Sequence, residues 1–135
     1  DCIAGVATGA IAYGIMVASK LNYPFVYVRG EAKKHGRQNQ IEGYLKPHSN
    51  VVVVEDLIST GQSSINAIST IEKSGAMVNG LISIFNYNLL NIKKIDTRYF
   101  SLCDYNTLIN VAIKKNMISE DEKEILLKWQ KNHLG

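Results

Sequence analysis

Two adjacent carboxylates and a run of hydroxyls follow directly on one apolar segment. After Val51–Val54 the sequence reads Glu55-Asp56-Leu57-Ile58-Ser59-Thr60-Gly61-Gln62-Ser63. A Ser/Thr/Gly loop that opens a helix offers unpaired backbone N–H groups and the positive end of the helix dipole to a phosphate. The carboxylates would repel a bare phosphate, but they suit the hydroxyls of a ribose and an accompanying Mg²⁺. The pattern therefore predicts a site for a ribose phosphate.

A second group of reactive side chains lies in a polar stretch punctuated by glycines. The net charge of +3 comes entirely from positions 29–37, which hold Arg29, Lys33, Lys34, Arg37 and Glu31. Cations aimed at a leaving pyrophosphate stabilise the negative charge that develops on it, and His35 can donate a hydrogen bond or a proton near neutral pH. We predict a mobile catalytic loop over about 30–43 that binds a small anion. A nucleic acid would need a wider basic face.

Alternating elements are expected to position both groups. Short apolar, β-branched runs at 3–7, 25–29, 51–54, 81–85 and 99–103 alternate with helical periods at about 11–21 and 63–74. This alternation predicts an α/β fold, a central parallel sheet flanked by helices. Open α/β sheets bind ligands at the carboxyl ends of their strands. We expect the strand over 51–54 to end at Glu55, which places the acid pair at that edge.

The other features predict one domain over residues 1–135. C-terminal helices are expected at about 105–132, where Ser119 and Glu122 form a capping box. Hydrophobic residues make up 46% and charged residues 20% of the chain, which favours a globular core over disorder. Cys2 and Cys103 lie in apolar runs without metal-ligand spacing, which predicts buried free thiols in a reducing compartment. No apolar run is long enough to span a bilayer, so we expect a cytoplasmic protein without membrane contact.

The two motifs together resemble a known family. The run from Glu55 to Gly61 resembles the signature of the type I phosphoribosyltransferases, which binds 5-phosphoribosyl 1-pyrophosphate (PRPP). The segments Arg29–Gly36 and Asn39–Gly43 resemble the mobile loop of the orotate phosphoribosyltransferases within that family. The resemblance covers essentially the whole chain. It implies the type I phosphoribosyltransferase fold and a pentosyltransferase that joins PRPP and orotate, with Mg²⁺, to give orotidine 5′-monophosphate and pyrophosphate in pyrimidine (UMP) biosynthesis.

The resemblance also implies roles for individual residues. The catalytic residues would be Arg29, Lys33 and His35, which with Lys34 contact the pyrophosphate side of PRPP. The residues expected to surround the ribose and its 5′-phosphate are Glu55 and Asp56 at the hydroxyls, then Leu57, Ile58, Ser59, Thr60, Gly61, Gln62 and Ser63 around the phosphate, with Ser59 also near orotate. Thr8 and Gly9 would form a pyrophosphate loop after the first strand.

The family pattern further implies how metal and subunits take part. Mg²⁺ would be held through PRPP, with Glu55 and Asp56 nearby and no direct protein ligand assigned. The family works as a homodimer in which the mobile loop is shared across subunits. The amino-terminal segment of the family helps to hold orotate. Because the chain begins with Asp1 rather than Met and enters an apolar strand at once, we expect that segment to be missing and this piece alone to have little or no activity.

Two positions depart from the family pattern. Gly30 stands where many members have a second basic residue, so pyrophosphate binding would rest more on Lys33 and Lys34. The run 85–87 reads Phe-Asn-Tyr, with Asn86 where some members carry an orotate-contacting arginine. Recognition of the base must therefore come partly from elsewhere.

Three other interpretations stay open. A phosphoribosyltransferase for another base, such as a purine, would share the PRPP motif, although the loop Arg29–Gly36 favours orotate. A non-catalytic PRPP-sensing regulator that binds RNA or DNA would need an extended basic face, which the charge distribution does not indicate. A dinucleotide-binding enzyme is the third, because Gly5, Gly9 and Gly14 follow the first strand, but their spacing is not G-x-G-x-x-G.

Overall fold

A single sheet organises the chain. The computed structural model describes residues 1–30, 39–89 and 96–133. Within these ranges the strands are β1 (Cys2–Val6), β2 (Phe25–Val28), β3 (Ile41–Glu42), β4 (Asn50–Ile58), β5 (Met77–Asn86) and β6 (Tyr99–Asp104). They form a six-stranded sheet of order β3-β2-β1-β4-β5-β6. All pairs are parallel except β2–β3, so the expected α/β fold with a parallel sheet is confirmed.

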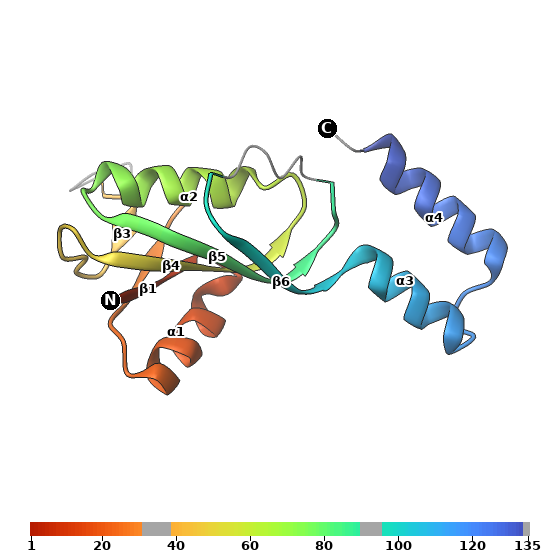
Figure 1. Ribbon diagram of the computed structural model, residues 1–135, viewed down its shortest axis with the longest axis horizontal. Coiled ribbons are helices and arrows are strands. Elements are labelled where there is room, and N and C mark those ends of the chain that lie inside the picture. The colour runs from red at the N-terminus through yellow and green to blue at the C-terminus, as the bar shows by residue number, and fades with distance from the viewer. Residues whose placement is uncertain (31–38, 90–95, 134–135) are drawn as a thin grey trace.

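Helices cover both faces of the sheet. The helices are α1 (Ala10–Leu21), α2 (Gln62–Lys73), α3 (Tyr105–Lys114) and α4 (Glu120–Asn132). In Figure 1, α2 lies above the sheet and α1 below it, while α3 and α4 extend away from the sheet beyond β6. Strand β1 pairs with both β2 and β4. The chain therefore adds strands on one side of β1 first and on its other side afterwards. Such a switch point is where sheets of this kind bind ligands.

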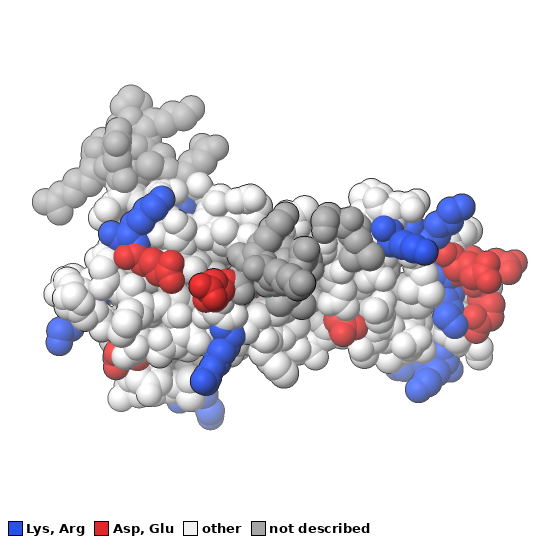
Figure 2. All heavy atoms as spheres, turned by 45° about the horizontal axis from the view of Figure 1, so that its top comes forward, with Lys and Arg blue, Asp and Glu red and all other residues white. Residues whose placement is uncertain are grey.

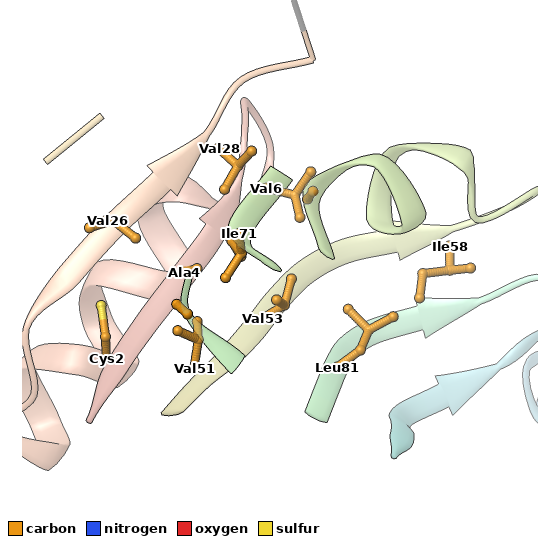
Figure 3. Packing of buried hydrophobic residues seen from close by; sticks show 12 residues of the cluster. Cys2, Ala4, Val6, Val26, Val28, Val51, Val53, Ile58, Ile71 and Leu81 are labelled. Carbon is orange, nitrogen blue, oxygen red and sulfur yellow. The ribbon is translucent and has the colours of Figure 1, made fainter. Parts of the chain in front are cut away.

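The core lies on both sides of the central strands. Val51 and Val53 belong to the larger apolar cluster together with Ile71 of α2, and Figure 3 shows these side chains converging between the strands and that helix. Val54 belongs instead to the cluster on the α1 side. Alternate residues of β4 therefore serve opposite faces, as strand geometry requires. Truncating a fully buried side chain such as Ile71 to alanine would cost about 2–5 kcal/mol.

Strand β4 is longer than the sequence pattern predicts. We expected it to end at Glu55, but it continues through the acid pair to Ile58. The neighbouring strand β5 explains the difference, because Glu55 is in register with Ser83 and Ile58 with Asn86. Pairing with β5 provides hydrogen-bond partners for the backbone N–H and C=O groups of this segment. A strand can therefore continue through charged residues where its neighbour also continues.

The polar stretch also holds an element that the pattern did not predict. Residues Ile41–Glu42 form β3, which pairs antiparallel with β2. The last residues of the predicted loop over about 30–43 are thus part of the sheet. Two residues have too little periodicity to be recognised in a sequence.

The C-terminal helices lie where the sequence predicts them, and α4 is tied to the end of β5. The predicted capping box of Ser119 and Glu122 is present at the start of α4. Gln130 of α4 donates a hydrogen bond of 2.8 Å to the carbonyl oxygen of Tyr87, just after β5. The rings of Tyr87, Tyr105 and Trp129 pack against one another beside this bond. Among the described residues, no helix combines the length and the apolar character needed to cross a membrane.

Both cysteines are free thiols, as expected. Cys2 is buried in the core, whereas Cys103 is only partly buried. The prediction of two buried thiols is therefore confirmed for Cys2 alone.

Candidate functional site

The functional candidates gather at the carboxyl edge of three neighbouring strands. The loop Ala7–Gly9 follows β1, Arg29 follows β2, and the loop Ser59–Gly61 follows β4. Because β1 lies between β2 and β4, these three segments leave the sheet side by side. The backbone of the first two is joined directly, since the N–H of Ala7 donates to the carbonyl oxygen of Val28 at 2.8 Å. The predicted pyrophosphate, ribose and phosphate contacts thus share one edge.

Glu55 points from β4 toward α2. Its side chain is 3% exposed, and Oε2 accepts hydrogen bonds from Ser63 Oγ at 3.1 Å and Ser64 Oγ at 3.0 Å. Burial raises the pKa of Glu55 to about 7, the neighbouring Asp56 carboxyl adds to the rise, and the two serine hydroxyls oppose it. Removal from water disfavours the charged form of a carboxyl group.

Asp56 points to the opposite face, toward the start of α1. Its Oδ1 accepts from the backbone N–H of Leu57 at 2.8 Å, and its carboxylate lies so close to Gly9 that a Cβ on that residue would overlap it. Gly9 is the N-cap residue of α1, and within the described chain no side chain caps this helix. The peptide between Ala7 and Thr8 is cis. The structure thus places the Asp56 carboxylate, predicted to contact the ribose, beside the Thr8–Gly9 loop.

The loop between β4 and α2 leaves a helix N-terminus open. Gly61 has φ 76 and ψ 3, in the left-handed region, and it precedes Gln62, the first residue of α2. No side-chain cap is found on this helix in the described part of the chain, and its first turn holds no acidic residue. The first N–H groups of a helix have no partner within the helix. Those of α2 are therefore available to an anion, which fits the predicted 5′-phosphate contacts.

Arg29 is held at the base of the polar loop. Its Nη1 lies 3.4 Å from Glu42 Oε1, and its backbone N–H donates to the carbonyl oxygen of Gln40 at 2.8 Å. The Gln40 amide nitrogen reaches the carbonyl oxygens of Arg29 at 3.5 Å and Gly30 at 3.4 Å. The hydroxyl of Thr70 in α2 lies 3.4 Å from Gln40 Oε1 and 2.8 Å from the carbonyl oxygen of Asn66, so these two acceptors share its one proton. The base of the loop is thus tied to both β3 and α2.

Two groups of residues at the site need a separate comment. One was predicted but is not described by the structure, and the other is described but was given no role by the sequence. The predicted contacts of Lys33, Lys34 and His35 lie outside the described residues. Gln40 and Glu42 were noticed only as part of the family motif and had no assigned role. Their signal was their position in the Asn39–Gly43 segment, but the contacts to Arg29 depend on β3, which the pattern did not predict.

Asn86, which the sequence analysis marked as a departure from the family pattern, makes two hydrogen bonds to its neighbour in the chain. Asn86 is 4% exposed at the end of β5. Its Nδ2 donates to Asn88 Oδ1 at 2.6 Å, and its Oδ1 accepts from the backbone N–H of Asn88 at 2.9 Å. Asn86 therefore shapes the turn after β5.

The charges on one face of the molecule are mixed. Figure 2 shows basic and acidic side chains interspersed over the described surface in that view, with both signs together at the end where α4 lies. Nucleic-acid-binding proteins typically gather cations in one patch or stripe. The visible face therefore does not favour a nucleic-acid-binding regulator.

Comparison with known proteins agrees with this geometry. The family model described as a phosphoribosyl transferase domain matches residues 1–114. The orotate phosphoribosyltransferase of Porphyromonas gingivalis is 44% identical over 136 residues, which cover 98% of this chain and 65% of the relative. That of Staphylococcus haemolyticus is 43% identical, with 98% and 67% covered. The crystal structure of orotate phosphoribosyltransferase from Aeropyrum pernix superposes with a TM-score of 0.73 at 27% identity, covering 87% of this chain and 66% of that one.

The sheet, its switch point and the acid pair beside an open helix N-terminus define the type I phosphoribosyltransferase fold. The chain belongs to the phosphoribosyltransferase family and, within it, groups with the orotate phosphoribosyltransferases. It spans about two thirds of the length of these curated relatives, at 65% and 67%. The dinucleotide-binding interpretation is therefore wrong.

Proposed function

We propose that the whole protein is an orotate phosphoribosyltransferase. It transfers the phosphoribosyl group of PRPP to orotate and releases orotidine 5′-monophosphate and pyrophosphate, a step of pyrimidine biosynthesis. The observation that carries the proposal is that the Asp56 carboxylate lies beside Gly9 of the Thr8–Gly9 loop, at the same sheet edge as the uncapped N-terminus of α2. The relatives at 44% and 43% identity support orotate as the acceptor base.

Each part of PRPP has a matching group at the sheet edge. The first turn of α2 receives the 5′-phosphate on unpaired N–H groups. The half-buried carboxylate of Asp56 accepts from the ribose hydroxyls. The backbone of Thr8–Gly9 and the fork of Arg29 take the pyrophosphate, a planar guanidinium being suited to paired phosphate oxygens. Arg29 must share its guanidinium between pyrophosphate and Glu42, its present partner.

The chemical step exchanges one bond at the anomeric carbon for another. The bond from C1 of the ribose to the pyrophosphate oxygen breaks, and its electron pair stays on that oxygen. A ring nitrogen of orotate loses its proton to solvent and forms the new bond to C1. Negative charge builds on the pyrophosphate as positive charge builds on the sugar. Cations on the pyrophosphate side, Arg29 and the expected Lys33 and His35, therefore stabilise the transition state more than the ground state.

Mg²⁺ is proposed as the cofactor, brought in with PRPP. The described residues contain no group of three or more His, Cys, Asp or Glu side chains arranged to hold a metal. The fit is that of an ion carried by substrate oxygens, with the Asp56 carboxylate near the ribose, because Mg²⁺ is commonly bound through substrate phosphates and one or two carboxylates. When bound, it neutralises charge on the leaving pyrophosphate.

We also propose a cytoplasmic homodimer in which the mobile loop is shared across subunits. Large apolar side chains are exposed on α1 and on the β5–β6 part of the sheet: Ile15 at 48%, Met16 at 67%, Leu21 at 56%, Ile82 at 40%, Phe100 at 62% and Leu102 at 68%. Apolar surface gathered in this way is typical of an interaction face. It supports burial against another surface.

The test is turnover by the full-length protein with PRPP, Mg²⁺ and either orotate or a purine base. We expect the absorbance of orotate to fall and the purine to be left unchanged. Turnover of a purine but not of orotate would replace this proposal with a phosphoribosyltransferase for another base. Tight PRPP binding without turnover of any base would favour a PRPP-sensing regulator.

A further inference from the structure

Gln130 is the point at which the C-terminal helix meets the end of the sheet. It is 8% exposed, and it is the only buried residue of α4, a helix that the structure describes in full. Its Nε2 donates a hydrogen bond of 2.8 Å to the carbonyl oxygen of Tyr87. A surface helix usually docks through an apolar stripe, whereas α4 buries an amide. Because burying a polar group is costly unless it is bonded, this contact specifies where α4 sits.

Aromatic rings keep the helix in the same place. The ring of Tyr87 lies 5.5 Å from that of Tyr105 and 6.0 Å from that of Trp129, between ring centroids. Tyr105 begins α3, and its hydroxyl lies 3.4 Å from the carbonyl oxygen of Leu126 in α4. Helix α4 therefore contacts Tyr87 through both its ring and its backbone.

Tyr87 in turn holds the beginning of the loop between β4 and α2. It directly follows β5, and its backbone N–H donates to the carbonyl oxygen of Ile58 at 2.9 Å. Ile58 is the last residue of β4, so this carbonyl belongs to the peptide group that opens the loop Ser59–Gly61. A peptide group is planar and rigid. A bond to its oxygen therefore also fixes the direction of the N–H of Ser59.

The other end of this loop is fixed by α2 itself. The N–H of Ile65 donates to the carbonyl oxygen of Gly61 at 2.9 Å, and the hydroxyl of Ser63 is bonded to Glu55. Within the described ranges no side chain caps the start of α2. The bond from Tyr87 is thus what ties the beginning of the loop to the neighbouring strand.

We infer that Gln130 is a positioning residue, which holds Tyr87 and, through Tyr87, the loop Ser59–Gly61 in the geometry that receives a sugar phosphate. The family model matches residues 1–114 and ends before α4, so the C-terminal helix acts on the site from outside the matched domain. The inference deepens the proposed function and rests on it, because it takes this loop and the start of α2 as the 5′-phosphate site.

The test compares two ligands that occupy different parts of the proposed site. Ribose 5-phosphate depends on the loop Ser59–Gly61, whereas pyrophosphate with Mg²⁺ depends on Thr8–Gly9 and Arg29, which follow β1 and β2. Binding of each ligand to the full-length protein is measured by titration calorimetry. Gln130→Met keeps the length of the side chain but removes the donor. We expect it to weaken ribose 5-phosphate by about fivefold, the value of a neutral hydrogen bond, and to leave pyrophosphate binding unchanged.

Two further variants separate positioning from a general loss of structure. Gln130→Glu keeps the shape of the side chain but puts a carboxylate against the Tyr87 carbonyl oxygen, so it should weaken ribose 5-phosphate at least as much. Lys128→Met introduces the same new side chain at an exposed position of α4, and as the matched control it should bind both ligands like the wild type. Melting temperatures show which variants fold, and Gln130→Glu gives the same comparison if Gln130→Met does not.

Kinetics of the same variants give a second readout. The KM for PRPP should rise by the factor lost in ribose 5-phosphate binding while kcat stays nearly constant, because the lost interaction is equal in the ground and transition states. A smaller folded fraction would instead lower kcat and leave KM unchanged.

The outcomes are distinct from those of the turnover test. An equal loss of both ligands, or wild-type binding of both by the folded Gln130 variants, would overturn the inference and limit Gln130 to docking α4. No binding of ribose 5-phosphate by the wild type would overturn it as well. Failure to convert orotate would refute the proposed function, while the difference between the two ligands would still decide the role of Gln130.

Discussion

At the end of β4, a single step along the chain gives two carboxylates different surroundings. Glu55 is enclosed beneath α2 and bonded by two hydroxyls, while Asp56 lies beside Gly9 at the start of α1. The residue types of this site were identified from the sequence, because acids and hydroxyls at this spacing suit a ribose phosphate. The sequence did not predict that the two carboxylates point to opposite faces of the sheet. That placement follows from the alternation of side chains along a strand, and we expected β4 to end before the acid pair.

Gly9 should be essential because of its closeness to Asp56. A Cβ at this position would overlap the Asp56 carboxylate and turn it away from the sugar. We expect Gly9→Ala to raise the KM for PRPP by about tenfold or more, the value of a lost charge-assisted hydrogen bond, with little change in melting temperature. Gly80→Ala is the control, since a Cβ there meets the Arg98 carbonyl oxygen at an ordinary 3.5 Å. Equal KM values for the two variants would contradict the geometry.

The raised pKa of Glu55 should be visible in stability. Because burial raises it from 4.5 to about 7, the folded protein binds a proton more tightly than the unfolded chain between these values. The free energy of unfolding should therefore fall as pH rises from about 4.5 to 7, by up to about 3 kcal/mol from this group.

Urea unfolding of the wild type and of Glu55→Gln at pH 5 and pH 8 isolates this contribution. The free energy of unfolding of the variant should fall less between pH 5 and pH 8 than that of the wild type, because glutamine does not ionise. Relative to the wild type, the variant should therefore be more stable at pH 8 than at pH 5. Glu72→Gln, at an exposed position of α2, serves as the control. The same pH dependence in Glu55→Gln and the wild type would show that Glu55 titrates normally.

Most elements follow from the sequence, and the exceptions depend on contacts between distant residues. The helix periods gave α1 and α2 to within a residue or two, and Ser119 with Glu122 marked the start of α4. The extension of β4 depends on β5, and β3 exists only because β2 lies beside it. Local periodicity carries no information about such partners.

The short strand β3 matters because it brings Gln40 to the base of the polar loop. The Gln40 side chain contacts the carbonyl oxygens of Arg29 and Gly30 and accepts from Thr70. We expect Gln40→Ala to lower kcat/KM for PRPP by a factor that corresponds to about 1 kcal/mol, the value of a neutral hydrogen bond.

Thr70→Val removes one of these contacts from the side of α2. If Gln40 acts partly through Thr70, the two substitutions remove the same contact. The double variant should then lose less kcat/KM than the combined losses of the two single variants. Wild-type kinetics in Gln40→Ala would show that the loop base does not depend on this side chain.

At the scale of the whole molecule, the proposed dimer would make each site depend on two chains. The described surface leaves large apolar side chains exposed on α1 and β6, and the chain spans 65% of the length of a curated relative. The proposed loop residues Lys33 and His35 would act in the site of the neighbouring subunit. A dimer of the full-length protein would then contain two sites, each built from both chains.

Mixing inactive subunits tests this arrangement. Lys33→Ala disables the loop and Asp56→Asn disables the sugar site, so each homodimer should be almost inactive. If the loop is shared, a mixed dimer contains one site with both residues intact. Random pairing of equal amounts makes about half of the dimers mixed, so about a quarter of the wild-type activity per active site should return. The control mixes Lys33→Ala with His35→Ala, both on the loop, and should recover nothing. No recovery in the first mixture would mean that each loop serves its own subunit.

The central claim is that this sheet edge transfers a phosphoribosyl group from PRPP to orotate. The most direct measurement follows orotate consumption and pyrophosphate release together in one reaction of the full-length protein. We expect the two to proceed one to one in the wild type and to be lost together in Asp56→Asn. Pyrophosphate release without orotate consumption, or undiminished turnover in Asp56→Asn, would contradict the account.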